Sequence, residues 1–453
     1  LQLDLAGHTV TTLPPRRPED GEGYLEIIEG TNSDSGGTVV NSAGTTISYT
    51  GLLSGSTQAN SIMGDADDVL MLTVRSQGEP FVGNMNGSMI ESSTAEVIWF
   101  ALPNGRTLPA DPAYGAGHTA QLYTLYRRVL LVNPTYFDAN SAALSGLLPA
   151  SLQKKYDLSV RPVYKLAPPP PLTVPPTPAS PPTVTGCLSN TLSTLTAREN
   201  RYYHPNSTAS SAFILSGFPF TANTAAVPLS QSIFNVVNPI RIGEDVILTD
   251  VLSFDIRVFD PLAALKLAPD KTTVLIPGEP EYPGVGTIVG YGAFVDLGYY
   301  AYFPGGKSTI FSVRPSGTNA AAYTPTAIAG LTSAANLLPN TYDTWSLSYE
   351  QNGIDEDNDA TTNISGAIDE GTDGLDDDPG GKQNNNGIVD DPPQMKIDFS
   401  ASPPTASIVS VGERETLPPY PFPLRGVQIR IRVYEPDTRQ VREVKVVQDF
   451  LPD

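Results

Sequence analysis

Hydrophobic residues occur along this 453-residue chain mainly as short runs bounded by turn-forming residues. The first three runs cover residues 69–74, 96–102 and 121–132, and the second ends at Pro103-Asn104-Gly105. Short runs rich in branched and aromatic side chains are typical of β-strands. The pattern therefore predicts three successive strands that pair as an antiparallel meander.

The clearest hairpin pattern lies near the C-terminal end. Apolar and polar residues alternate from 427 to 433, a turn sequence follows at 435–438, and a second strand pattern covers 441–447. Alternation predicts strands with one buried face. The opposite face is expected to be basic, because it carries Arg430 and Arg432.

Three further segments complete the pattern. Residues 245–259 predict two strands around Asp250, and the aromatic run at 291–303 predicts another. Residues 1–10 fit either the end of a helix or the start of a strand. Residues 167–184 are rich in proline, which predicts an extended linker or surface strap.

These elements divide the chain into five expected parts. They are a first β-rich part at 1–166, the linker or strap at 167–184, a second β-rich part at 185–351, an acidic insert at 352–394 and a C-terminal hairpin at 395–453 that closes the domain. The fold class predicted from the whole pattern is α+β, predominantly antiparallel β, with long loops.

Composition supports a β-rich protein and narrows its ligands. Gly (39) and Pro (43) are abundant while charged residues make up only 17%, which disfavours a helical bundle. A net charge of −21 argues against nucleic acid and favours cations. Cys187 is the only cysteine, so an intramolecular disulfide is excluded. No apolar run is long enough to span a bilayer, so an export signal or anchor is expected upstream of Leu1.

An acidic segment between Asn352 and Asp391 accounts for about half of the net charge. Its twelve acids stand against Lys382 alone and recur in a small unit. The unit appears as Gly353-Ile354-Asp355-Glu356, Ala367-Ile368-Asp369-Glu370, Gly374-Leu375-Asp376-Asp377 and, more loosely, Gly387-Ile388-Val389-Asp390-Asp391. The segment is therefore a repeat rather than a random run of charge.

Calcium is the ion that suits this repeat, because it takes six to eight oxygen ligands from flexible loops. Asp355, Asp357 and Asp359 match the first three ligand positions of an EF-hand loop. Ala360 then replaces the expected glycine, and Gly366 replaces the bidentate glutamate. A noncanonical calcium loop is predicted, and a solvated acidic loop without calcium is the alternative.

Catalytic motifs are not found, so the chain is predicted not to be an enzyme. His8, His118 and His204 stand in no metal-ligand spacing, and no G-x-S-x-G motif occurs. The glycine-rich run at 284–290 misses the dinucleotide fingerprint by one residue. Paired carboxylates among 48 acids keep an extracellular hydrolase open as a third reading.

Several stretches together resemble pilin-like proteins of bacterial type II secretion and type IV pilus systems, in the minor pseudopilin J and PilW-like group of planctomycete type. The stretches cover residues 3–7, 64–71, 125–132, 251–258 and 423–435, and the acidic insert precedes the last of them. The leader and nearly all of the N-terminal hydrophobic helix of that family lie outside the sequence. Leu1 to Ala6 would correspond to the C-terminal end of that helix.

The resemblance implies a pilin-like globular domain and a structural, non-catalytic role. The expected place is a pseudopilus tip or a surface filament, in the periplasm or at the cell surface of a bacterium. The expected partners are other pilin-like subunits or copies of the chain itself, with membrane contact only through the missing helix. In such a domain the acidic segment becomes a structural calcium insert, with Asp355, Asp357, Asp359, Asp369, Asp373 and Asp376 as predicted ligands.

The second reading is a calcium-dependent extracellular adhesin or carbohydrate-binding protein. The 20 tyrosines and the proline-rich strap favour it. Adhesion is therefore the alternative to assembly, and hydrolysis ranks third.

Overall fold

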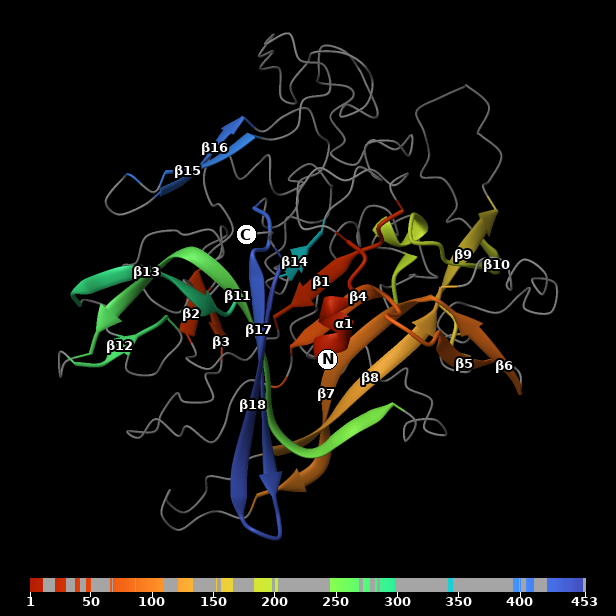
Figure 1. The fold of residues 1–453 in the computed structure, drawn as a ribbon, viewed down its shortest axis with the longest axis horizontal. Coiled ribbons are helices and arrows are strands. Elements are labelled where there is room, and N and C mark those ends of the chain that lie inside the picture. Colours follow the sequence, from red (N-terminus) through yellow and green to blue (C-terminus); the bar gives the residue numbers. More distant parts are fainter. Residues whose placement is uncertain are drawn as a thin grey trace.

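A computed structural model of the chain describes residues 1–10, 21–29, 37–40, 46–49, 66, 68–85, 87–108, 121–132, 152, 156–165, 183–197, 200–202, 245–268, 272–277, 282, 286–297, 341–344, 394–398, 400, 405–410 and 422–450. These residues are almost entirely β, with strands β1 to β18 beside the helix α1 (Gln2–Ala6) and the 3-10 helix η3 (Thr194–Thr196). The predicted α+β, pilin-like fold class is therefore wrong. The described residues form a curled antiparallel half-barrel sheet (Figure 1).

The main sheet collects strands from widely separated parts of the chain, all antiparallel to their neighbours. Its order is β14 (Thr341–Asp343), β1 (Leu25–Ile28), β4 (Val69–Arg75), β7 (Thr94–Thr107), β8 (Gln121–Leu131), β11 (Val246–Leu267), β17 (Gly426–Glu435) and β18 (Gln440–Asp449). β12 (Val274–Leu275) and β13 (Ile288–Val295) also pair with β11. The two-stranded sheets are β2 (Gly37–Val40) with β3 (Thr46–Tyr49), β5 (Phe81–Met85) with β6 (Ser88–Ser92), β9 (Val160–Lys165) with β10 (Thr183–Ser189), and β15 (Gln394–Asp398) with β16 (Thr405–Ser410).

The predicted meander is confirmed as β4, β7 and β8, which are neighbours in the sheet. Its apolar runs are continuous because both faces of these strands are buried. Leu70 and Leu72 of β4 lie in a first core cluster that also holds Leu5 of α1, while Val69 and Met71 lie in a second cluster on the opposite face. Leu5 of α1 contributes to the first cluster and Leu195 of η3 to the second, so a short helix helps to cover each face.

β11 corrects the expectation of two strands around Asp250. It is one strand of 22 residues in which Asp250 adopts a positive φ of 56°. Its register shifts repeatedly, and it pairs in turn with β8, β17 and β13. Bulges of this kind bend a strand and increase its twist. β11 is therefore where the sheet curls.

The C-terminal hairpin is confirmed. β17 and β18 pair without a register shift from Glu435 opposite Gln440 to Gly426 opposite Asp449. Val427 and Ile429 of β17 are fully buried, as the alternation predicted. The hairpin forms a long arm of the molecule (Figure 1).

Other predicted segments have mixed outcomes. Residues 1–10 contain a helix, α1, and the strand expected at 291–303 is confirmed as far as Val295. Of the proline-rich segment, Thr183 and Val184 are described, as the start of β10. In the described part of the chain, no helix is long and apolar enough to cross a membrane.

Candidate assembly site

The helix α1 is fixed to the main sheet through one buried carboxylate. Asp4, which is 4% exposed, accepts hydrogen bonds from Arg127 Nε (2.7 Å) and Nη2 (2.6 Å) and from Trp99 Nε1 (2.9 Å). Trp99 on β7 and Arg127 on β8 are directly opposite each other in the antiparallel register. The register of the meander therefore builds the receptor for Asp4, and a bidentate arginine holds it in a defined orientation.

The chain that follows α1 is attached to β4 by its backbone. Arg75 donates its N–H to the Gly7 carbonyl (2.7 Å), and Thr9 donates its N–H to the Thr73 carbonyl (3.0 Å). A Cβ at Gly7 would meet the Arg75 carbonyl oxygen at 2.7 Å, which is too close for any side chain. Only glycine therefore allows this approach of the helix end to the sheet.

α1 also meets the C-terminal hairpin. The helix packs beside β18, and the His8 ring stands edge-on to Phe450 with centroids 5.0 Å apart. Leu5 is fully buried in the first core cluster, whereas Leu3 on the same helix is 77% exposed. The two ends of the described chain thus form one surface, in which Leu3 is the large exposed apolar residue of α1.

A buried ionic cluster lies within the sheet, away from this surface. Arg201, 2% exposed, contacts Glu26 and Asp343, each through Nη1 at 2.8 Å, and stacks over the Tyr24 ring. Glu96 accepts hydrogen bonds from the Tyr24 hydroxyl (2.6 Å) and from other groups of the same cluster. Burial, reinforced by the charge of Glu96, raises the pKa of Tyr24 well above its usual value.

Two further buried arginines hold carboxylates in a similar way. Arg128 contacts Asp157 at 2.9 Å, and Arg257 contacts Asp255 at 3.0 Å. Asp157 comes from another segment than Arg128, whereas Asp255 lies on the same strand as Arg257, which also contacts Asp296 at 3.2 Å. Arg128 and Arg257, like Arg201, are therefore held in buried ion pairs and do not face solvent.

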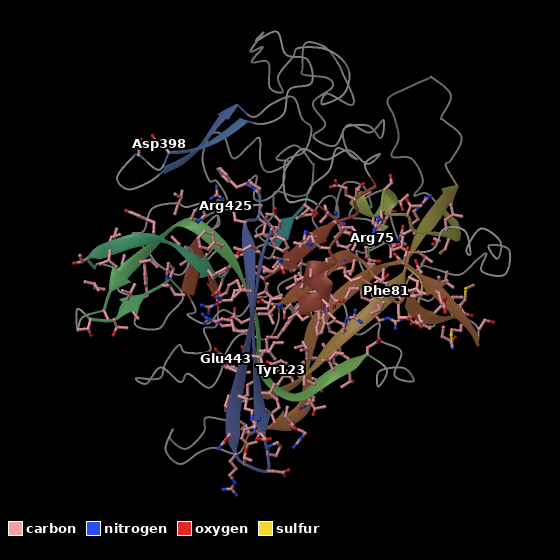
Figure 2. The ribbon with its side chains drawn as sticks, viewed as in Figure 1. Arg75, Phe81, Tyr123, Asp398, Arg425 and Glu443 are labelled. Atoms are coloured by element: carbon pink, nitrogen blue, oxygen red, sulfur yellow. The ribbon has the colours of Figure 1, made fainter. Side chains whose placement is uncertain are left out.

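The hairpin carries paired charged side chains towards its turn. Glu443 of β18, labelled in Figure 2, accepts a hydrogen bond from Arg432 Nε at 2.7 Å. Burial raises the pKa of Glu443, but the hydrogen bond and positive charge of Arg432 outweigh it and leave that pKa below its usual value. A hydrogen bond from Thr438, with help from Arg442, lowers the pKa of Glu435. Both carboxylates are thus stabilised in their charged form.

The predicted calcium ligands lie outside the described residues. These are Asp355, Asp357, Asp359, Asp369, Asp373 and Asp376. Within the residues that the structure describes, no group of three or more His, Cys, Asp or Glu side chains is arranged to hold a metal ion. Calcium binding by the acidic segment therefore stays a prediction.

Sequence reasoning missed Asp4, Trp99 and Arg127 as a unit. The available sign was a single carboxylate in the apolar stretch from Leu1 to Leu5, since a charge on the buried side of a helix needs a partner. Which partner it finds depends on strand register, which the sequence pattern does not supply.

Comparison with protein-family models, with curated proteins and with solved structures found no match. The protein is therefore described by its own fold and by the contacts of its buried side chains. It is a curled, antiparallel β-sheet protein with a helix seated on the sheet and buried arginine–carboxylate clusters that join distant segments.

Proposed function

We propose that the chain is a structural, non-catalytic subunit of an extracytoplasmic assembly, such as a type II secretion pseudopilus or a type IV pilus-like surface filament. Other pilin-like subunits or copies of the chain would be its partners. The proposal does not require an α+β pilin fold. It requires a rigid body that presents a fixed surface to its neighbours.

The observation that carries the proposal is the fixed attachment of α1 next to the hairpin. Asp4 binds Arg127 of β8, Gly7 is hydrogen-bonded to Arg75 of β4, and the His8 ring contacts the Phe450 ring. Leu3 is left 77% exposed on this immobilised helix. An exposed apolar group on a rigid helix suits a protein contact, because little conformational entropy is lost when a neighbour covers it.

Structural calcium belongs to the same proposal. The repeated acidic unit in residues 352–394 supports it, because clustered carboxylates that repel one another gain most from a shared divalent cation. Calcium would then stabilise the segment that leads into the C-terminal strands.

Cross-linking in the native cell tests the assembly role. We expect the chain to cross-link to pilin-like subunits or to itself in an extracytoplasmic or sheared-filament fraction. Leu3→Glu should reduce these products, while Met89→Glu, a matched change at a residue 75% exposed on β6, should not. Recovery as an unassembled protein that binds glycans only with calcium would instead support the adhesin alternative.

A further inference from the structure

β18 is the last strand of the main sheet, and within the described residues it pairs on one side only, with β17. Phe450 donates its N–H to the carbonyl of Arg425, the residue opposite it in this register. Hydrogen-bonded and non-hydrogen-bonded positions alternate along antiparallel strands. The backbone N–H and C=O groups of Val441, Glu443, Lys445 and Val447 therefore point away from β17.

This edge lacks most of the features that normally block pairing. Natural edge strands are short, bulged, interrupted by proline or charged. β18 has ten residues, contains no proline and keeps a continuous register. Val444 is 56% exposed and Val447 is 44% exposed, so apolar side chains accompany the available backbone groups.

The sequence of β18 is complementary to itself when two copies run antiparallel about Val444. In that register Glu443 of each copy lies opposite Lys445 of the other, and Val441 lies opposite Val447. Opposite charges and branched apolar pairs are the combinations that stabilise cross-strand neighbours. Glu443 and Lys445 have outward backbone groups, so they would also exchange two hydrogen bonds across the new edge.

The neighbouring registers between two copies of β18 are disfavoured because they place like charges opposite each other. A two-fold axis at Arg442, Glu443 or Lys445 places that residue opposite its own copy, and an axis at Val446 places Glu443 opposite Asp449. Like charges directly opposite each other are destabilising. Among the axes from Arg442 to Val446, only the one at Val444 avoids a pair of like charges.

We infer that two copies of the chain join edge to edge through β18, antiparallel about a two-fold axis at Val444, so that the main sheet continues from one molecule into the other. This inference rests on the proposed assembly role and names a second copy as one partner. Such a contact is isologous, because the same strand serves both sides.

Engineered cysteines test the register. The two Val444 residues form a non-hydrogen-bonded pair with Cα atoms about 4.5 Å apart, a separation that a disulfide can bridge. Val444→Cys should give a covalent dimer under mild oxidation. Val447→Cys is the matched control, because its two copies would be about 20 Å apart. Equal cross-linking of both variants, or none with Val444→Cys, would overturn the inference. The native Cys187 is buried and does not compete.

A charge reversal tests the pairing without weakening the fold. Lys445 lies opposite Arg430 within its own hairpin, so Lys445→Glu replaces a like-charge pair in the monomer. Across the two-fold axis the same change places the new carboxylate opposite Glu443 of the other copy, and it does so twice. We expect the dimer dissociation constant to rise by about tenfold or more, with unchanged thermal stability of the monomer.

Sedimentation velocity measures this dissociation constant, and two outcomes would overturn the inference. One is a wild-type chain that stays monomeric as concentration rises, and the other is a Lys445→Glu chain that dimerises as well as wild type. A monomeric chain that still cross-links to pilin-like subunits in cells would remove the pairing but leave the proposed function. A purified chain that dimerises but cross-links neither to pilin-like subunits nor to itself in an extracytoplasmic or sheared-filament fraction would leave the pairing but remove the proposed function.

Discussion

Replacement of Arg127 by methionine should release α1 from the sheet. Asp4 would stay buried with the Trp99 N–H as its remaining hydrogen-bond donor among these contacts. Removal of one partner of a buried ion pair costs about 3–5 kcal/mol. The Arg127 side chain is 25% exposed, so we expect the lower end of that range, about 3 kcal/mol. Arg127→Lys keeps the charge but loses the fork of two bonds, and should cost about half as much.

Urea unfolding followed by circular dichroism measures the free energy of unfolding, and hydrogen exchange at the Leu5 and Gly7 amides reports release of the helix. A double-mutant cycle with Asp4→Asn and Arg127→Met separates the pair from other effects. The double variant should be clearly more stable than the sum of the two single losses predicts. Strictly additive losses, or a loss below about 1 kcal/mol for Arg127→Met, would refute the role assigned to this pair.

Three further results are expected. Arg201→Met should cost about 3–5 kcal/mol in urea unfolding because it leaves Glu26 and Asp343 buried without their cation, and the triple variant Glu26→Gln, Arg201→Met, Asp343→Asn should cost less than the single one. Burial raises the pKa of Cys187 to about 12, so the free energy of unfolding should fall as pH rises above about 8.5, the unfolded thiol value, and Cys187→Ala should make that fall shallower. A calcium chelator should lower the melting temperature by several degrees, and an unchanged melting curve would contradict structural calcium.

Strand positions could be predicted from the sequence because they depend on local pattern. The continuous run at 69–74 and the alternation at 427–433 each specify a strand whatever the rest of the chain does. β11 was divided wrongly because Asp250 has the sequence appearance of a turn, although the strand continues through it with a positive φ. Whether a strand continues through a bulge depends on its pairing with the neighbouring strands, which the local sequence pattern does not show.

The fold class and the site depended on long-range information. The resemblance to pilin-like proteins suggested an α+β domain, whereas the apolar runs are buried on both faces of a curled sheet. Asp4 meets Trp99 and Arg127 only because β7 and β8 pair in one register. Arg201 likewise joins carboxylates 175 and 142 residues away in sequence, which no local pattern reveals.

The pairing of β1 with β14 has a consequence for how the protein is made. Glu26 lies opposite Asp343, and the Leu25 N–H is donated to the Thr344 hydroxyl, 319 residues later in the chain. Folding is slow when contacts are so distant in sequence, because a long loop must close before the contact forms. Synthesis must pass residue 344 before β1 gains its second neighbour, so the nascent chain carries an incomplete sheet until then. Protection of that open edge until the chain is complete is therefore a requirement of this topology, whatever the finished protein binds.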